Sequence, residues 1–221
     1  MKLTIFNGSP RGQNSNTNLL LEQFLRGFCE TPGNSYEVYH LNQIAKHEEF
    51  VQAYANAEAV LIGFPLYTDG MPGVVKEFVD RLQPFVGREG NPAMGFLVQS
   101  GFIESLHSRY VEKYLRKLAQ RLGARYIGTI VKGGLEGIRM QPPNMTRKLF
   151  ACFEEIGRVY AQTGSFDPHL LRRLAKPERI SPLLIPFIWL LSLTGLTNFY
   201  WDMMLKENKA YDRRFAQPYC E

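Results

Sequence analysis

Short apolar runs alternate with longer segments of helical periodicity over residues 2–162. The apolar runs have the length of buried strands, whereas the longer segments repeat apolar residues every three or four positions. The predicted strands are Lys2–Asn7, Glu37–His40, Ala59–Phe64, Ala93–Gln99 and Tyr126–Lys132. The predicted helices are Asn18–Glu30, Phe50–Asn56, Val74–Pro84, Ser105–Leu122 and Met145–Gln162. This alternation is typical of an α/β, three-layer, doubly wound parallel sheet, and five strands give the expected order 2-1-3-4-5.

The predicted helix from Ser105 holds much of the positive charge of the chain. Ser105 is a candidate N-cap, and Gly123 ends the helix. The expected apolar stripe is Leu106, Tyr110, Tyr114 and Leu118. The cations, interpreted as a solvated face, are Arg109, Lys113, Arg116, Lys117, Arg121 and Arg125. Because the net charge of +5 comes with no nucleic-acid-binding motif, we do not expect a nucleic acid partner.

The C-terminal part of the chain departs from the strand–helix pattern. From Ile180 to Trp201 no side chain is charged, a length that would permit a membrane span. Pro182, Pro186 and Gly195 interrupt this run, and basic residues lie on both sides of it. A buried element or a dimer interface is therefore favoured over a span, and an interfacial membrane contact is a less favoured alternative.

The aromatic residues that end the uncharged run are interpreted as core. They are Phe199, Tyr200 and Trp201. We predict one domain over residues 1–165 and a helical, apolar extension over 166–221 that is not an independent domain.

A loop of Gly, Ser, Asn and Thr connects the first predicted strand to the first predicted helix. Free N–H groups at a helix N-terminus, with the positive end of its dipole, form an anion site. The hydroxyls of Ser9, Ser15 and Thr17 add donors, and Arg11 supplies a charge that can pair with a phosphate. The loop matches neither a P-loop nor the Gly-x-Gly-x-x-Gly of dinucleotide folds. The alternative is an ordinary turn with Asn16 or Thr17 as N-cap.

A second polar loop follows the third predicted strand. Its residues are Pro65, Leu66, Tyr67, Thr68, Asp69, Gly70, Met71, Pro72 and Gly73. Tyr67 offers a flat face for stacking, and Gly70 and Gly73 let the backbone approach a ring. Since the first and third strands are neighbours in the expected order, both loops lie at the switch point where such sheets bind ligands. The sequence predicts a ligand with a phosphate at one end and a planar system at the other.

The motifs of these two loops resemble those of the flavodoxin-like NAD(P)H-dependent FMN reductase and quinone reductase family. They are Gly8-Ser9-Pro10-Arg11, Ser15-Asn16-Thr17 and Pro65-Leu66-Tyr67, continued by Pro72, Lys76 and Asp80-Arg81. The resemblance implies FMN with its phosphate on the first loop and its isoalloxazine along Pro65 to Gly70. It also implies a third contact from the loop after the fourth strand, at Ser100, Gly101 and Phe102. The first loop is longer than usual around Gln13 and Asn14, which leaves open whether Ser15, Asn16 or Thr17 contacts the phosphate.

The family resemblance implies an enzyme in which NADPH or NADH stacks transiently on FMN and passes hydride to it. The reduced flavin then gives electrons to a small acceptor such as a quinone or a flavin. No side-chain catalyst is demanded, and Tyr67 is the candidate that bounds the ring. Backbone N–H groups of Thr68–Gly70 or Ser100–Phe102 would stabilise negative charge on the reduced ring.

The family also implies a homodimer with the flavin near the subunit boundary. In that arrangement the aromatic residues 199–201 would alternatively wall a substrate pocket. Some relatives carry a cysteine cluster between the second and third strands, and the absence of cysteine from Leu41 to Glu58 excludes it here. The loop Gly133–Gly137 after the fifth strand either flanks the flavin or only turns the chain.

Two other function classes compete with a reductase. One is a flavodoxin-like electron carrier for a protein partner, although such carriers are commonly acidic and this chain is basic. The other is a flavin-free binding module at a membrane or in a complex. In that case the uncharged C-terminal run would form the contact with the membrane or partner.

The cysteines and histidines give no sign of a disulfide framework or a metal site. The cysteines are Cys29, Cys152 and Cys220. They form no Cys-x-x-Cys, and the N-terminus enters a strand rather than a signal peptide, so we expect a cytoplasmic setting. The histidines, expected at the surface or in packing and without metal-ligand spacing, are His40, His47, His107 and His169.

Overall fold

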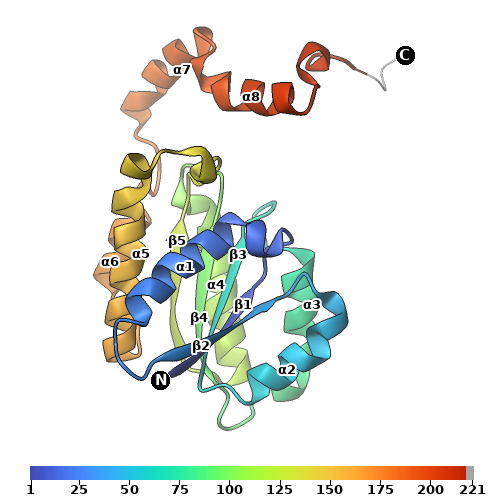
Figure 1. The fold of residues 1–221 in the computed structure, drawn as a ribbon, viewed down its shortest axis with the longest axis vertical. Coiled ribbons are helices and arrows are strands. Elements are labelled where there is room, and N and C mark those ends of the chain that lie inside the picture. The colour runs from blue at the N-terminus through green and yellow to red at the C-terminus, as the bar shows by residue number, and fades with distance from the viewer. Residues whose placement is uncertain (218–221) are drawn as a thin grey trace. The chain divides into compact units, whose positions relative to one another are not determined.

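The computed structural model describes residues 1–217, and the chain divides into two compact units, Met1–Arg179 and Ile180–Glu221. Each unit is described by itself (Figure 1). Of the cysteines, Cys29 is an exposed free thiol and Cys152 a half-buried one. Cys220 lies outside the described residues.

The first unit is built on a five-stranded, all-parallel sheet with the order β2-β1-β3-β4-β5 (Figure 1). Its strands are β1 Lys2–Asn7, β2 Ser35–His40, β3 Ala59–Pro65, β4 Ala93–Gln99 and β5 Tyr126–Lys132. The predicted fold class and strand order are confirmed. The arrangement is flavodoxin-like, with β1 and β3 adjacent at the point where the winding of the sheet reverses.

Helices cover both faces of this sheet. They are α1 Asn16–Phe28, α2 His47–Ala55, α3 Gly73–Arg81, α4 Arg109–Leu122, α5 Pro143–Thr163 and α6 Pro168–Leu174. Helices α2, α3 and α4 form one apolar layer with Val60 and Ile62 of β3. Helices α1, α5 and α6 form the other layer with Leu61, because successive side chains of a strand point to opposite faces. Two buried cores therefore enclose a strand that is apolar along its whole length.

Helices α1 and α5 cross with their backbones in direct contact. A Cβ added to Gly27 of α1 would lie 1.8 Å from the carbonyl oxygen of Glu154, and a Cβ on Gly157 of α5 would lie 1.9 Å from that of Phe24. Neither helix can accept a side chain at these positions without moving away from the other. The two glycines therefore determine how closely α5 packs over the sheet.

The first helix begins earlier than its apolar pattern predicts. Helix α1 starts at Asn16 rather than Asn18, and its N-cap is Ser15 rather than Asn16 or Thr17. Ser15 is extended, with φ −104° and ψ 155°, and its Oγ accepts a hydrogen bond from the N–H of Asn18 at 3.1 Å. A short 3₁₀ turn, Gly12–Asn14, brings Ser15 into this position.

The prediction for the fourth helix is wrong in two respects. Residues Ser105–Ser108 form a 3₁₀ turn before α4 begins at Arg109, and Ser105 makes no capping bond. The buried stripe is Val111, Leu115, Ala119 and Leu122, whereas Tyr110 and Tyr114 are exposed. The tyrosines lie on the face next to this stripe because each directly precedes a buried residue, Val111 or Leu115, and successive helical residues are about 100° apart. Gly123, in the left-handed conformation with φ 77°, ends the helix as predicted.

The second unit contains α7 Ile185–Leu193 and α8 Phe199–Glu207. Its apolar side chains are exposed, among them Phe187, Trp189, Phe199 and Trp201. The expectation that the uncharged run is a buried element, with its aromatic residues as core, is therefore wrong for the described chain. Among residues 1–217, no helix is long and apolar enough to cross a membrane.

The second unit begins at Ile180, later than the predicted extension over 166–221, because part of residues 166–179 packs against the sheet domain. Phe166, Leu170 and Leu174 are buried in the layer formed by α1 and α5 and so belong to the first unit.

Candidate functional site

Three loops meet at the carboxyl edge of the sheet. The strand register pairs Asn7 of β1 with Gly63 of β3, Pro65 of β3 with Gln99 of β4, and Gln99 with Lys132 of β5. The loops that follow β1, β3 and β4 therefore start side by side. The structure brings together the three segments that the sequence singled out.

The loop after β1 is held by its own hydrogen bonds. Asn7 Oδ1 accepts from the N–H of Ser9 at 3.0 Å, and the Oγ of Ser9 accepts from the N–H of Arg11 at 3.4 Å. Ser15 Oγ donates to the carbonyl of Gly12 at 2.6 Å. Thr17 is fully buried, and its hydroxyl accepts from Gln99 Nε2 at 3.4 Å. The hydroxyls of Ser9, Ser15 and Thr17 thus already take part in shaping the loop.

The N-terminus of α1 supplies backbone donors that the helix itself does not use. The first residues of a helix have N–H groups without an intrahelical acceptor. The third of these, Asn18, is capped by Ser15. Those of Asn16 and Thr17 make no hydrogen bond within residues 1–217. This pair of N–H groups, with the positive end of the helix dipole, can accommodate an anion.

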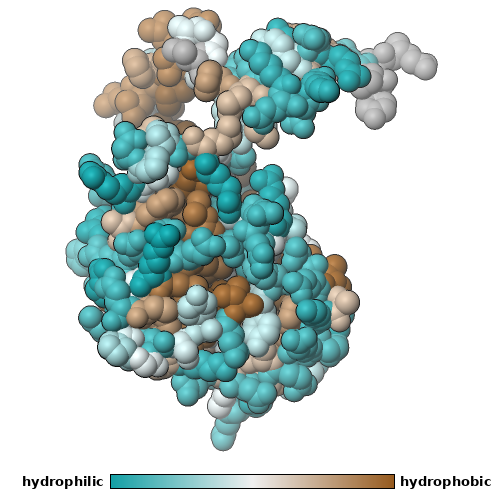
Figure 2. All heavy atoms as spheres, viewed as in Figure 1, coloured by the Kyte–Doolittle hydropathy of each residue, from teal (hydrophilic) through white to brown (hydrophobic). Residues whose placement is uncertain are grey.

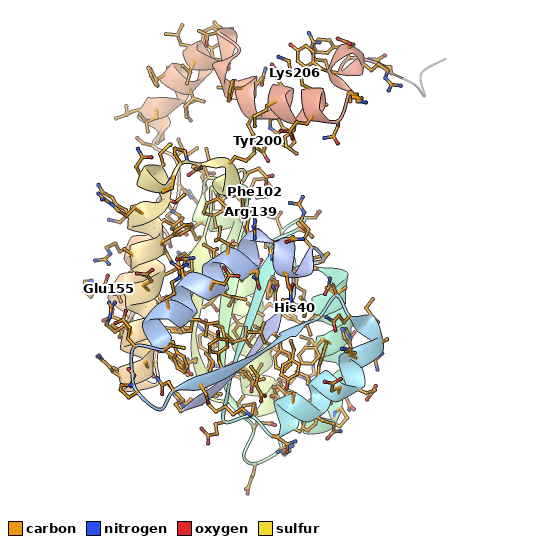
Figure 3. The ribbon with its side chains drawn as sticks, viewed as in Figure 1. His40, Phe102, Arg139, Glu155, Tyr200 and Lys206 are labelled. Atoms are coloured by element: carbon orange, nitrogen blue, oxygen red, sulfur yellow. The ribbon has the colours of Figure 1, made fainter. Side chains whose placement is uncertain are left out.

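Two arginines stand at this loop. Arg11 is exposed at its beginning, as the sequence places it. Arg139 comes from a 3₁₀ turn after β5, and its guanidinium donates to the carbonyl of Ser15 at 2.6 Å. Sequence reasoning missed Arg139. The sequence feature that could have identified Arg139 is its position just after the glycine loop that follows β5, at the carboxyl edge of the sheet. Figure 3 labels Arg139 and Phe102 at this edge of the sheet.

The loop after β3 ends in a strained turn. Tyr67 and Gly70 exchange two backbone hydrogen bonds of 3.0 Å, and the residues between them, Thr68 and Asp69, have φ of +47° and +59°. Positive φ at both central positions is a type I′ turn, which is unfavourable for a β-branched threonine. Strain of this kind concentrates at functional sites. The turn leaves the Tyr67 ring 47% exposed, while Pro65 and Leu66 are buried.

The loop after β4 presents a second exposed aromatic ring. Phe102 is 49% exposed, Gly101 is exposed, and Ser100 is buried with its Oγ donating to the carbonyl of Phe102 at 3.3 Å. The glycine loop after β5 braces this segment. Gly134 donates to the carbonyl of Phe102 at 2.7 Å, and a Cβ on Gly133 would lie 2.3 Å from the same oxygen.

The same glycine loop also reaches the first loop, because Asn16 Nδ2 donates to the carbonyl of Leu135 at 2.9 Å. Since the glycine loop contacts the loops after β1 and β4, it does more than turn the chain.

His107 joins the loops after β3 and β4. Its ring stacks on Phe102 with the centroids 4.4 Å apart. Its Nδ1 lies 3.6 Å from Asp69 Oδ1, and its Nε2 lies 3.7 Å from Glu104 Oε2. An imidazole between two carboxylates can hold and exchange a proton. The sequence placed His107 at the surface or in packing, because nothing in its neighbourhood marks the contact with Asp69.

Some of the backbone N–H groups of Thr68–Gly70 and Ser100–Phe102, which were expected to face a bound ring, already donate hydrogen bonds within the protein. The N–H of Gly70 donates to Tyr67, and that of Ser100 donates to Lys132. Those of Thr68, Asp69, Gly101 and Phe102 have no acceptor among the described residues. Four backbone donors on the loops after β3 and β4 are therefore available to a ligand.

The residues present fit FMN at both of its ends. At one end lie a helix N-terminus with unused N–H groups and two arginines, which suit a phosphate. At the other end lie two half-exposed aromatic rings with free N–H groups on the same two loops, which suit a planar heterocycle.

The model of the family NADPH-dependent FMN reductase matches residues 1–131 of the chain. This match covers β1 to β4 and most of β5, and so includes the three loops. No curated protein sequence matches the chain.

Several solved structures share the fold. An FMN-dependent NADH-azoreductase from Bacillus anthracis in complex with FMN is 17% identical, with a TM-score of 0.56, over 73% of this chain and 100% of that one. An NAD(P)H:quinone oxidoreductase from Methanothermobacter marburgensis is 19% identical, with a TM-score of 0.56, over 72% and 96%. A flavone reductase is 14% identical, with a TM-score of 0.59, over 100% of both chains. The last match therefore includes the C-terminal unit.

Proposed function

The chain belongs to the NADPH-dependent FMN reductase family, and we propose that its three carboxyl-edge loops hold FMN and serve the transfer of electrons from NADPH or NADH to a small planar acceptor. A quinone and a second flavin are acceptors of this class. The observation that carries the proposal is the pair of half-exposed rings, Tyr67 and Phe102, on adjacent loops beside a helix N-terminus whose first two N–H groups have no acceptor among the described residues. The aromatic rings that suit the flavin also suit a planar acceptor or a nicotinamide, because each of these is a flat ring that can stack.

The phosphate of FMN belongs at the start of α1. The N–H groups of Asn16 and Thr17 are the donors without a partner there, and Arg11 and Arg139 supply the positive charge. The hydroxyl of Ser15 already caps α1, so we assign it to shaping the loop rather than to the ligand. Buried Ser9 and Thr17 support the loop in the same way.

When bound, FMN supplies the two-electron chemistry between the nicotinamide and the acceptor. Tyr67 and Phe102 position the planar groups, and the free N–H groups of Thr68 and Asp69 favour negative charge near them. His107, held between Asp69 and Glu104, is placed to give a proton to an acceptor oxygen. Chemistry of this kind needs no further side-chain nucleophile.

We further propose a homodimer in a cytoplasmic setting. The exposed tyrosines of α4, Tyr110 and Tyr114, offer an apolar surface that a second copy would cover. The free thiols of Cys29 and Cys152 are consistent with a reducing compartment.

Replacement of Tyr67 by alanine is expected to weaken FMN binding about five-fold, because one aromatic stacking contact contributes about 1 kcal/mol. The measurement is an FMN titration of apoprotein by flavin fluorescence. Tyr36→Ala is the matched control, since Tyr36 is 46% exposed on β2, outside the three loops. An FMN affinity equal to that of the Tyr36 variant would remove Tyr67 from the site.

A further inference from the structure

Helix α7 exposes apolar side chains on every side. Successive helical residues are 100° apart, so Phe187 and Trp189 project about 160° away from each other. Both are 63% exposed, and Leu183, just before the helix, is 88% exposed. Figure 2 shows apolar residues covering this segment. Such a helix is stable only where apolar surroundings enclose it.

The hydroxyls at the C-terminal end of α7 are hydrogen-bonded to carbonyls of the helix. Ser192 Oγ donates to the carbonyl of Trp189 at 2.6 Å, and Thr194 Oγ1 donates to that of Leu191 at 2.6 Å. With these bonds made, neither hydroxyl needs water. These side chains can therefore enter a medium without hydrogen-bonding partners at little cost.

The dimensions of α7 suit entry into one leaflet of a bilayer. Its nine residues span about 14 Å, which is less than half of the roughly 30 Å hydrocarbon core. The two tryptophans of the chain, Trp189 and Trp201, both lie in this part of the sequence. Tryptophan is enriched where a membrane meets water.

Unpaired cations directly precede the segment. Arg172, Lys176 and Arg179 form no ion pair within residues 1–217. The one carboxylate among residues 172–179, Glu178, is bound by Arg109 with an N–O distance of 2.7 Å, which holds the pKa of that carboxyl below its usual range. Cations beside an apolar segment are complementary to anionic lipid headgroups.

We propose that α7 inserts into the surface of a bilayer that contains anionic phospholipid, to which the cations that precede it in the sequence are complementary in charge. A second copy of the chain is the competing occupant. A protein partner covers one side of a helix and leaves the rest to water, whereas the apolar side chains of α7 are exposed on every side and need apolar surroundings all round. The unpaired cations find their counter-charge in the lipid and not in an apolar dimer interface. This docking is independent of the flavin chemistry proposed above.

The test is flotation of the full-length protein with vesicles. Vesicles of phosphatidylcholine and phosphatidylglycerol are compared with vesicles of phosphatidylcholine alone. We expect the protein to float with the anionic vesicles and several-fold less with the neutral ones. Tryptophan emission should shift to shorter wavelength only when anionic vesicles are present.

The double variant Phe187→Gln/Trp189→Gln should lower the bound fraction at least about tenfold, because two apolar side chains no longer enter the lipid. The control Tyr36→Gln should float like the wild type. An unchanged circular dichroism spectrum shows that each variant is folded.

Three results would overturn the proposal. The first is no flotation with either vesicle, and the second is equal flotation of wild type and double variant. The third is a wild-type dimer that the double variant converts to a monomer, with tryptophan emission already at short wavelength without vesicles. That last result would assign α7 to a second copy.

Discussion

Replacement of Asn16 by proline is expected to raise the FMN dissociation constant about 10- to 100-fold relative to Asn16→Ala. Proline removes the N–H at the first position of α1, where no intrahelical bond depends on it, and its fixed φ suits that position. Ser15, with φ −104° and ψ 155°, already has the extended conformation that a following proline requires. A hydrogen bond to a charged phosphate contributes about 1.5–3 kcal/mol, which corresponds to this change in affinity.

The comparison with alanine isolates the backbone group. Both variants lose the bond from Asn16 Nδ2 to the carbonyl of Leu135, so this loss cancels between them. Riboflavin, which lacks the phosphate, should bind the two variants equally. The account of the phosphate site fails if proline and alanine give the same FMN affinity, or if riboflavin distinguishes them as strongly as FMN does.

Replacement of Gly157 by alanine is expected to destabilise the protein by about 3 kcal/mol. The added methyl would lie 1.9 Å from the carbonyl oxygen of Phe24 and 3.0 Å from the backbone nitrogen of Phe28. These are backbone atoms of α1, so the clash is relieved only if α1 and α5 separate and the layer beneath them loosens. Urea unfolding followed by circular dichroism measures the change in the free energy of unfolding.

Gly73→Ala is the matched control for this overpacking. Gly73 begins α3 without a positive φ, and no atom lies within 4 Å of the position a Cβ would take. Alanine there should be neutral or stabilise by up to about 1 kcal/mol. A Gly157 variant as stable as the Gly73 variant would show that the two helices are not in the close contact described.

The central strands of the sheet could be predicted from the sequence because they are largely apolar on both faces. Ala93–Gln99 and Tyr126–Lys132 are mostly apolar runs bounded by polar turns, and β4 and β5 have those limits. A strand buried between two helical layers has no polar side to obscure its ends. The strand order then followed from the alternation with helices.

Helix starts and faces were less predictable. The cap at Ser15 depends on the turn Gly12–Asn14 before it, and apolar periodicity carries no information on such a turn. In α4 two neighbouring stripes are both largely apolar, and only the packing against the sheet selects Val111 and Leu115 over Tyr110 and Tyr114.

The candidate site was predictable where one strand end determines it and not where distant segments meet. Tyr67 and Phe102 directly follow β3 and β4, so the topology places them. His107 reaches Asp69 across two loops, and Arg139 contacts Ser15 from 124 positions further along the chain. Contacts of this kind depend on the tertiary structure and leave no local pattern.

The central claim, that this chain is an FMN-dependent reductase, is tested most directly by the visible spectrum of the purified protein under anaerobic conditions. The spectrum is recorded after incubation with FMN and again after addition of NADPH, and of NADH to a second sample. We predict a bound-flavin spectrum that bleaches with at least one of the two nucleotides, and the faster one identifies the donor. A bound flavin that stays oxidised with both would indicate an electron carrier, and failure to bind FMN at all would contradict the site itself.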